Sequence, residues 1–241
     1  MREVILIKTG EIALKGLNRG SFEDILVKNI RWRLKPFGKF EIQRAQSAIT
    51  LQPLSDDIDL DEVCEAVGKI FGIAAYSRAL VTEKDFETIR RDAVVYLESA
   101  MEDIRTFKVE AKRSDKRFPY TSPEISAELG GDLLQAYPHL KVDVRHPDMT
   151  VMVEIRDYAA YIHGPQIEGA GGLPVSSSGQ AMLLISGGID SPVAGYMMAR
   201  RGLKLSAIHF VSPPYTSDRA LDKVETLLKI LTGYTGNITF Y

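Results

Sequence analysis

The sequence lacks several features that would place it in other classes of protein. It has a single cysteine, Cys64, in 241 residues, which excludes an internal disulfide and an all-cysteine zinc site. No apolar run approaches the roughly 20 residues of a membrane-spanning helix, and the N-terminal apolar run Val4–Ile7 is much shorter than the core of a signal peptide. We therefore expect a protein of the reducing cytoplasm that does not enter a membrane.

The chain also lacks a large net charge, because its 30 basic residues nearly balance its 32 acidic residues. The distribution along the chain is uneven. Basic residues outnumber acidic ones in residues 1–35 and 108–117, whereas residues 56–65 contain six acidic residues and no basic one. Because salt screens charges beyond about 8–10 Å, these local excesses matter more to a polyanionic partner than the net charge.

The first 81 residues alternate between strand-like and helix-like apolar spacing. The pattern predicts a β-α-β-β-α-β order, which is typical of a ferredoxin-like domain, with elements at 4–8, 20–35, 39–45, 48–53, 60–69 and 73–81 and a turn at Gln46-Ser47. Asp57, Asp59 and Asp61 precede the second helix, and we interpret them as a helix start rather than as a metal site.

The next region, residues 82–165, is predicted to hold helices at 85–103 and 124–136 and strands at 107–113, 140–144, 150–155 and 158–162. Glycine, proline and serine then dominate residues 164–179, so we place a linker at 166–180. The chain is thus predicted to be an α/β and α+β multidomain protein with domains at 1–81, 82–165 and 181–241.

After the linker the pattern becomes strand-helix-strand-helix-strand, with elements at 182–185, 191–201, 204–210, 217–231 and 237–241. A short, fully apolar strand suits a parallel sheet covered on both faces. About 60 residues rarely bury enough surface to fold alone. We therefore expect the first part of a doubly wound domain, and hence a C-terminally truncated chain; a small lobe docked on the rest is the alternative.

A glycine-rich turn joins the first strand and helix of this region, in the sequence Ile185-Ser186-Gly187-Gly188-Ile189-Asp190-Ser191-Pro192. Glycines let the backbone approach a ligand, and free N–H groups at a helix start attract anions, so a phosphate group is the expected ligand. The turn lacks the lysine of the GxxxxGK[ST] loop. A generic Gly-Gly turn without a ligand remains the alternative.

The Ser186–Ser191 stretch resembles the SGGxD[ST] motif of the PP-loop ATP pyrophosphatases. The resemblance implies cleavage of ATP between its α- and β-phosphates, with pyrophosphate held by Ser186, Gly187, Gly188 and Ser191. Asp190 would hold Mg²⁺ or position the phosphates as the catalytic residue. Adenine would lie across the strand ends at Leu184, Ile185, His209 and Phe210, although His209 could equally be a strand-end histidine with a satisfied hydrogen bond.

The resemblance extends along the whole chain, which is similar to the bacterial tRNA 4-thiouridine synthetase family. The matching stretches are Gly10–Arg19, Phe107–Arg113, Val151–Ile155, Gly169–Pro174 and Ile208–Ser217. They imply a ferredoxin-like domain, a THUMP RNA-binding domain and a PP-loop domain in that order. The sequence departs from the family pattern at Thr9, where tyrosine is common, and at Ser176, where glycine is usual.

Resemblance to THUMP implies tRNA binding, and basic residues in both excesses are the candidate contacts. They would bind phosphates and read shape, the alternative being solvated surface charges: Lys15, Arg19, Lys108, Lys112, Arg113, Lys116 and Arg117. Tyr120 could stack on a base, but we expect it to pack on its own domain.

The family reaction activates the C4 oxygen of a tRNA uridine with ATP, after which persulfide sulfur displaces AMP. The resemblance implies a cysteine desulfurase as sulfur donor, a link to the thiamine sulfur-carrier protein, and a homodimer. Cys64 lies on a predicted core-facing helix, so we expect the carrier cysteine beyond Tyr241 and the chain alone to be inactive. Two alternatives remain: a PP-loop ligase acting on a small molecule, and an RNA-binding module without catalysis.

Overall fold

The computed structural model describes residues 1–45, 48–212 and 217–241, which form two compact units. The first unit comprises residues 1–6 and 77–166, and the second comprises residues 7–76 and 167–241. Two strands, β1 (Arg2–Thr9) and β4 (Ile73–Thr82), contain the boundary. The domain bounds expected from the sequence stay predictions.

The ferredoxin-like order is confirmed. The elements that follow β1 are α1 (Arg19–Leu34), β2 (Phe40–Ala45), β3 (Ala48–Pro53) and α2 (Leu60–Gly68), and β4 completes the set. The strands are ordered β2-β3-β1-β4, and α1 buries Leu26, Ile30 and Leu34. Two short 3-10 helices, η1 (Glu11–Leu14) and η2 (Gly16–Asn18), were not expected. The predicted turn at Gln46-Ser47 lies outside the described residues.

The acidic cluster before α2 is a helix start, as predicted. The Asp59 carboxylate accepts hydrogen bonds from the backbone N–H groups of Asp61 (2.8 Å) and Glu62 (3.4 Å). Within the described residues, no group of three His, Cys, Asp or Glu side chains could hold a metal ion. The Cys64 side chain is buried on this helix, so its predicted core-facing position is confirmed.

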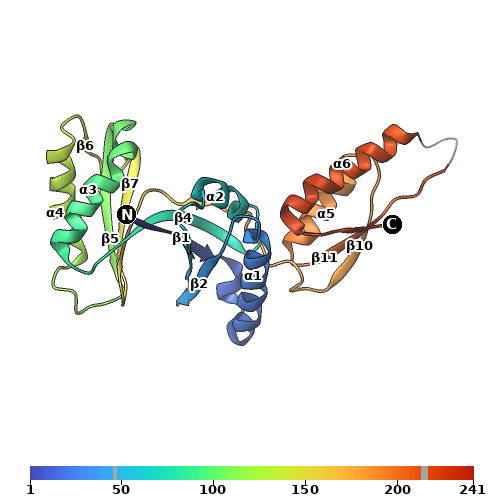
Figure 1. Ribbon diagram of the computed structural model, residues 1–241, viewed down its shortest axis with the longest axis horizontal. Coiled ribbons are helices and arrows are strands. Elements are labelled where there is room, and N and C mark those ends of the chain that lie inside the picture. The colour runs from blue at the N-terminus through green and yellow to red at the C-terminus, as the bar shows by residue number, and fades with distance from the viewer. Residues whose placement is uncertain (46–47, 213–216) are drawn as a thin grey trace. The chain divides into compact units, whose positions relative to one another are not determined.

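The first unit packs two helices on one face of its strands (Figure 1). Its elements are α3 (Phe86–Glu102), β5 (Thr106–Arg113), α4 (Ser122–Ala136), β6 (Lys141–Val142), β7 (Met149–Ile155) and β8 (Ala160–His163). The strand order from β4 is β8-β7-β5-β6, with β5 parallel to β7 and β7 antiparallel to β8. Ile89 and Leu133 from the helices are fully buried against Phe107 and Val151.

The segment predicted as a linker is packed rather than free. Strand β9 (Ile167–Glu168) pairs with β4, and Leu173 and Val175 are buried. The backbone N–H of Gly72 donates to the carbonyl of Gly171 at 2.8 Å. This segment therefore forms part of the second unit's core.

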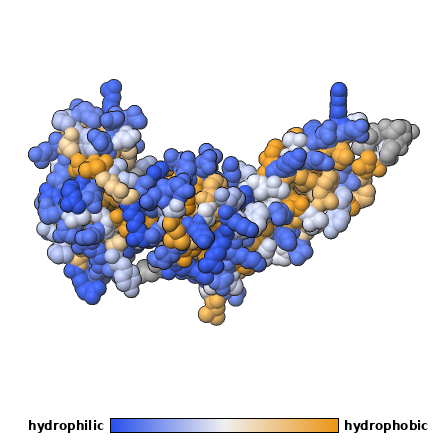
Figure 2. Space-filling view, viewed as in Figure 1, coloured by the Kyte–Doolittle hydropathy of each residue, from blue (hydrophilic) through white to orange (hydrophobic). Residues whose placement is uncertain are grey.

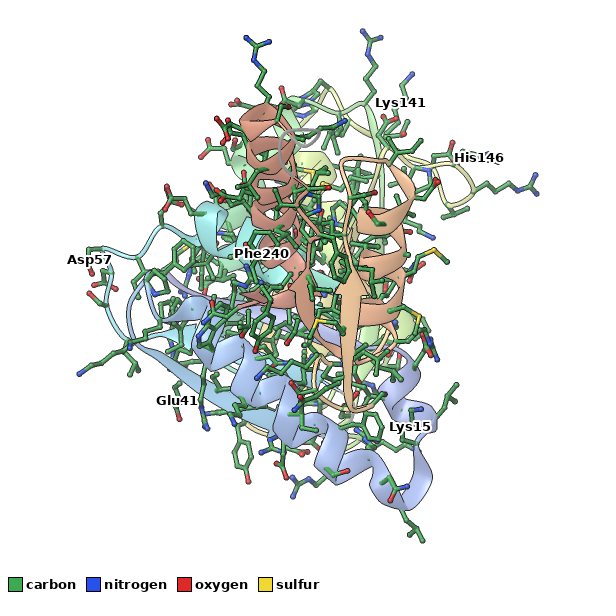
Figure 3. All side chains as sticks on the ribbon, turned by 90° about the vertical axis from the view of Figure 1, so that its right-hand side faces the viewer. Lys15, Glu41, Asp57, Lys141, His146 and Phe240 are labelled. Carbon is green, nitrogen blue, oxygen red and sulfur yellow. The ribbon has the colours of Figure 1, made fainter. Side chains whose placement is uncertain are left out.

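The last part of the second unit is a short parallel sheet with two helices. Its elements are β10 (Gln180–Leu184), α5 (Asp190–Arg200), β11 (Lys204–Ile208), α6 (Asp218–Thr235) and β12 (Thr239–Phe240), and Phe240 is labelled in Figure 3. The strands are parallel in the order β10-β11-β12. One face packs on α5 and α6, while Met182 and Leu184 on the other face are exposed. Hydrophobic residues, drawn in orange, lie at the surface of this part of the chain (Figure 2).

An aromatic cluster ties this sheet to the ferredoxin-like part within the second unit. The Phe71 ring lies 5.1 Å from Tyr196 and 5.9 Å from Tyr234, measured between ring centroids. Phe71 is buried together with Val175, Ala199 and Leu205. No helix in the described parts of the chain is long and apolar enough to cross a membrane.

Candidate nucleotide and RNA sites

The glycine-rich turn follows the buried Ile185 directly and ends where α5 begins, at Asp190. Its two serines hold it: Ser186 N–H donates to Ser191 Oγ (3.2 Å), and Gly188 N–H donates to Ser186 Oγ (3.3 Å). The residue before α5, Ile189, makes no side-chain capping bond. The first N–H groups of α5 are therefore available to an anion.

The two glycines of the turn are not required by the fold itself. A Cβ at Gly187 would meet its nearest neighbour at 3.5 Å and one at Gly188 at 3.4 Å, which are ordinary contacts. Neither residue has a positive φ. Close approach of a ligand to the bare backbone explains glycine here better than local sterics do.

A lysine that sequence reasoning missed lies beside the turn. Lys223 of α6 places its Cδ 3.5 Å from the position of a Gly187 Cβ, and within the described residues its ammonium has no ion-pair partner. It supplies the positive charge that the turn itself lacks. The only signal in the sequence was a basic residue on a predicted helix, which many surface lysines share.

The predicted adenine-contacting residues come together at the carboxyl edge of the sheet. Leu184 pairs with Ile208 across β10 and β11, and Ile185 N–H donates to the Ile208 carbonyl at 2.9 Å. Leu184 and Phe210 are exposed at this edge, with 66% and 72% of their surface accessible. They offer an apolar platform beside the turn.

His209 fits both of its interpretations. Its Nδ1 lies 2.8 Å from the Ile185 carbonyl, which can only accept, so Nδ1 carries the proton. The Nε2 atom is then an acceptor, and it is buried without a hydrogen-bond partner. A buried acceptor with no partner is costly unless a ligand donates to it.

Asp190 is exposed at the first position of α5. Mg²⁺ is commonly held by one or two carboxylates together with substrate phosphates and water. A single carboxylate next to an anion-binding turn fits that donor set. A metal would also offset the repulsion between Asp190 and a bound triphosphate.

The basic residues at 108–117 are not equally available to RNA. Lys112 and Lys116 are exposed, and neither forms an ion pair in the described part of the chain. The Arg113 guanidinium instead donates to the Phe118 carbonyl (3.1 Å) and the Tyr120 carbonyl (2.7 Å). Lys108 pairs with Glu110 at 2.7 Å.

The loop after β5 is anchored by Asp115. Its carboxylate accepts from Lys84 Nζ at 2.6 Å and from Arg117 Nε at 3.1 Å, and these bonds hold the pKa of Asp115 well below its usual range. Arg117 remains 88% exposed despite this pairing. Tyr120 packs on Phe86 with ring centroids 4.2 Å apart, as the packed interpretation predicted.

The two candidates in the ferredoxin-like part also have intramolecular neighbours. Lys15 Nζ lies 5.0 Å from the centroid of the Phe22 ring, and Arg19 pairs with Glu23 at 2.6 Å. Both side chains remain partly exposed.

A buried charge cluster lies on β7 and β8 beside Lys112, which pairs in register with Glu154. Glu154 accepts from Arg156 at 2.7 Å, and His163 Nε2 lies 3.5 Å from its other oxygen. Burial raises the pKa of Glu154, but the hydrogen bonds and charges of His163 and Arg156 outweigh it and lower that pKa to about 2.

Three family models match consecutive parts of the chain. They describe the ThiI ferredoxin-like domain (residues 4–77), the THUMP domain (83–163) and the thiamine biosynthesis protein ThiI (176–241). These ranges agree with the order of domains expected from the sequence.

Curated relatives match the chain along its length. Probable tRNA sulfurtransferases of Acetivibrio thermocellus and Alkaliphilus oremlandii are each 46% identical over 100% of this chain, which spans 62% of their length.

Solved structures are similar to the chain over nearly its whole length. A 4-thiouridine synthetase–RNA complex with bound ATP is 37% identical, with a TM-score of 0.87 over 98% of this chain and 60% of that one. A Pyrococcus horikoshii protein is 28% identical, with a TM-score of 0.85 over 99% of this chain and 78% of that one. With two ThiI-type segments on either side of a THUMP domain, and these similarities along the full sequence, the chain belongs to the ThiI family.

Proposed function

We propose that the protein acts as a tRNA sulfurtransferase that converts a uridine to 4-thiouridine. ATP transfers its adenylyl group to the C4 oxygen of the uridine and releases pyrophosphate. The outer sulfur of a protein persulfide then displaces AMP, and a second thiol cleaves the remaining S–S bond, which releases 4-thiouridine and leaves a disulfide. Adenylation makes the C4 oxygen a good leaving group, which is why ATP is consumed. The proposal rests on one observation above all: the 186–191 turn leaves backbone N–H groups available at the start of α5.

The side chains around the turn take separate roles in this proposal. The Gly187 N–H, the first N–H groups of α5 and Ser191 hold the β- and γ-phosphates, with Lys223 as a nearby cation. Asp190 would hold Mg²⁺, which would supply positive charge beside the phosphates. His209 Nε2 accepts a hydrogen bond from the adenine amino group, and Leu184 and Phe210 flank the base.

The RNA contacts are proposed on the exposed cations Lys112, Lys116 and Arg117, with Lys15 and Arg19 contributing from the ferredoxin-like part. The solved relative that contains RNA and ATP supports both ligand classes. We further propose a cytoplasmic homodimer that receives sulfur from a cysteine desulfurase and serves a thiamine sulfur-carrier protein. Cys64 is buried and does not act as the sulfur carrier.

Pyrophosphate release from ATP labelled in its terminal phosphates tests this function in the full-length protein. We expect release to depend on unmodified tRNA. Pyrophosphate release with a small acid in place of tRNA would support a ligase that acts on a small molecule. If the folded protein releases no pyrophosphate under either condition, the result would support an RNA-binding module without catalysis.

Asp190→Ala should lower the tRNA-dependent release by about 100-fold or more, because one group that neutralises phosphate charge is lost. Its tRNA affinity should stay within about twofold of the parent protein. The matched control is Asp218→Ala, which removes an acidic residue from the same first position of α6. Equal rates for the two variants would remove Asp190 from the active site.

A further inference from the structure

A small recess in the second unit is lined by basic residues and contains no acidic one. It has a volume of about 250 Å³. Helix α1 contributes one wall, the start of β11 another and the end of α6 a third. The polar and aromatic lining residues include Lys28, Asn29, Trp32, Arg33, Ser176 and Lys204. The recess is separate from the 186–191 turn, none of whose residues line it.

The three cations of the recess have no acidic partner within ion-pair distance in the part of the chain that the structure describes. Within the described residues, Lys28, Arg33 and Lys204 form no ion pair. The Arg33 Nε atom is buried without a hydrogen-bond partner, and its Nη2 reaches only the Thr232 carbonyl at 3.4 Å. Burial lowers the pKa of Arg33. Arg33 is half-buried, and a partly desolvated guanidinium without a carboxylate is costly, so an external anion would relieve the cost.

A neighbouring recess is lined by acidic as well as basic residues. It has a volume of about 630 Å³ and shares Trp32 and Arg33 with the first. There, Lys35 and Lys69 face Glu62 and Glu65. The smaller recess differs from this neighbour in having no acidic residue in its lining.

The wall made by Val175 and Ser176 is held in an unusual conformation. Ser176 has a φ of 75°, and no other non-glycine residue in the described part of the chain has a positive φ. Asn29 Nδ2 donates to the Val175 carbonyl at 3.1 Å and fixes this wall against α1. A non-glycine residue in this region costs roughly 1–3 kcal/mol, and such strain often accompanies ligand sites.

We propose that this recess binds a phosphate group through Arg33, Lys28 and Lys204. Arginine and lysine together are the residues that bind phosphate oxygens most effectively, and a guanidinium binds two of them at once. The ring of Trp32, 49% exposed at the rim, is placed to cover the organic part of a phosphate ester. A phosphodiester of bound RNA and a free phosphate ester share this chemistry.

The protein carries its own reporter for the test, because Trp32 is its single tryptophan. Titration with sodium phosphate at constant ionic strength should change the Trp32 emission in a saturable manner, while sodium chloride should leave it unchanged. Lys28→Gln and Lys204→Gln should each weaken phosphate binding by about fivefold to tenfold. Arg33→Gln should abolish it.

Lys35→Gln is the matched control, since Lys35 follows α1 directly and lies outside the recess. The Lys28 and Lys204 variants keep the test valid if Arg33→Gln fails to fold. An emission that does not saturate with phosphate, or an equal loss of binding in Lys35→Gln, would overturn the proposal.

Addition of tRNA identifies the source of the phosphate. If tRNA competes with phosphate and Lys204→Gln lowers the tRNA affinity, the ligand is an RNA phosphodiester. If tRNA binds without displacing phosphate, the ligand is a free phosphate ester. Neither outcome depends on pyrophosphate release, so failure of the proposed function and failure of this site are distinguishable.

Discussion

Charged groups are used differently in the basic strand and loop at 108–117 and in the glycine-rich turn at 186–191. In the first region most charges have internal partners, such as Arg113 with two carbonyls and Lys108 with Glu110. In the second, Asp190 and Lys223 have no ion-pair partner within the described residues. Charges with internal partners stabilise the fold, whereas those without them are available to a ligand. Substitutions of the paired charges should therefore lower the stability of the fold, whereas substitutions of the unpaired charges should weaken ligand binding.

The largest effect on stability is expected at Glu154 in the buried cluster beside Lys112. Its folded-state pKa of about 2 lies below the usual 4.5. The carboxylate therefore stabilises the fold above about pH 4.5, and this contribution is lost as the pH falls toward 2. Glu154→Gln should lower the free energy of unfolding at pH 7 by about 3 kcal/mol, with the difference from the parent protein shrinking toward pH 2.

Urea denaturation at several pH values between 7 and 3 measures this difference in the free energy of unfolding, with hydrogen exchange of the first unit as the readout. Glu102→Gln, at the exposed end of α3, is the control and should leave stability within about 0.5 kcal/mol. A difference that does not vary with pH would show that Glu154 contributes by packing rather than by charge.

A smaller loss of stability is expected from Arg113→Ala. The guanidinium holds the carbonyls of Phe118 and Tyr120 in place, so its removal should cost about 2 kcal/mol. Thermal or urea unfolding measures it, and Lys112→Ala on the same strand should stay within about 0.5 kcal/mol. Equal stability of the two variants would show that Arg113 does not stabilise the loop, and Arg113 would again be a candidate RNA contact.

The smallest change is expected in tRNA binding. Alanine at both Lys112 and Lys116 should weaken binding by roughly fivefold and reduce the slope of log K against log salt by about 1.5. Filter binding at several salt concentrations gives both values. Lys108→Ala is the internal comparison, because Glu110 already offsets that charge at 2.7 Å. A Lys108 effect as large as that of either exposed lysine would show that internal pairing does not decide which cations contact RNA.

The sequence was sufficient to predict the order of helices and strands, because apolar spacing and helix-start residues such as Asp59 are local signals. It also located the 186–191 turn. Strand β9 was missed because its two residues are defined only by pairing with β4. The strand predicted at 204–210 ends at Ile208, where His209 turns its ring to the Ile185 carbonyl.

Which basic residues are free could not be predicted from sequence. Lys84 reaches Asp115, and Arg113 reaches carbonyls five and seven residues ahead, only because the loop folds back on β5. Lys223 approaches Gly187 from a helix that follows two further elements of the chain. These contacts depend on tertiary structure, whereas the 186–191 turn is encoded by neighbouring residues in the sequence.

The most direct test of the central claim, that the 186–191 turn binds the phosphates of ATP, is nuclear magnetic resonance of backbone amides during titration with ATP and Mg²⁺. We expect the amide signals of Ser186, Gly187 and Gly188 to shift first and most, and to shift less in Lys223→Ala than in the control Lys229→Ala. Unchanged signals in the turn, with shifts elsewhere in the protein, would contradict the account.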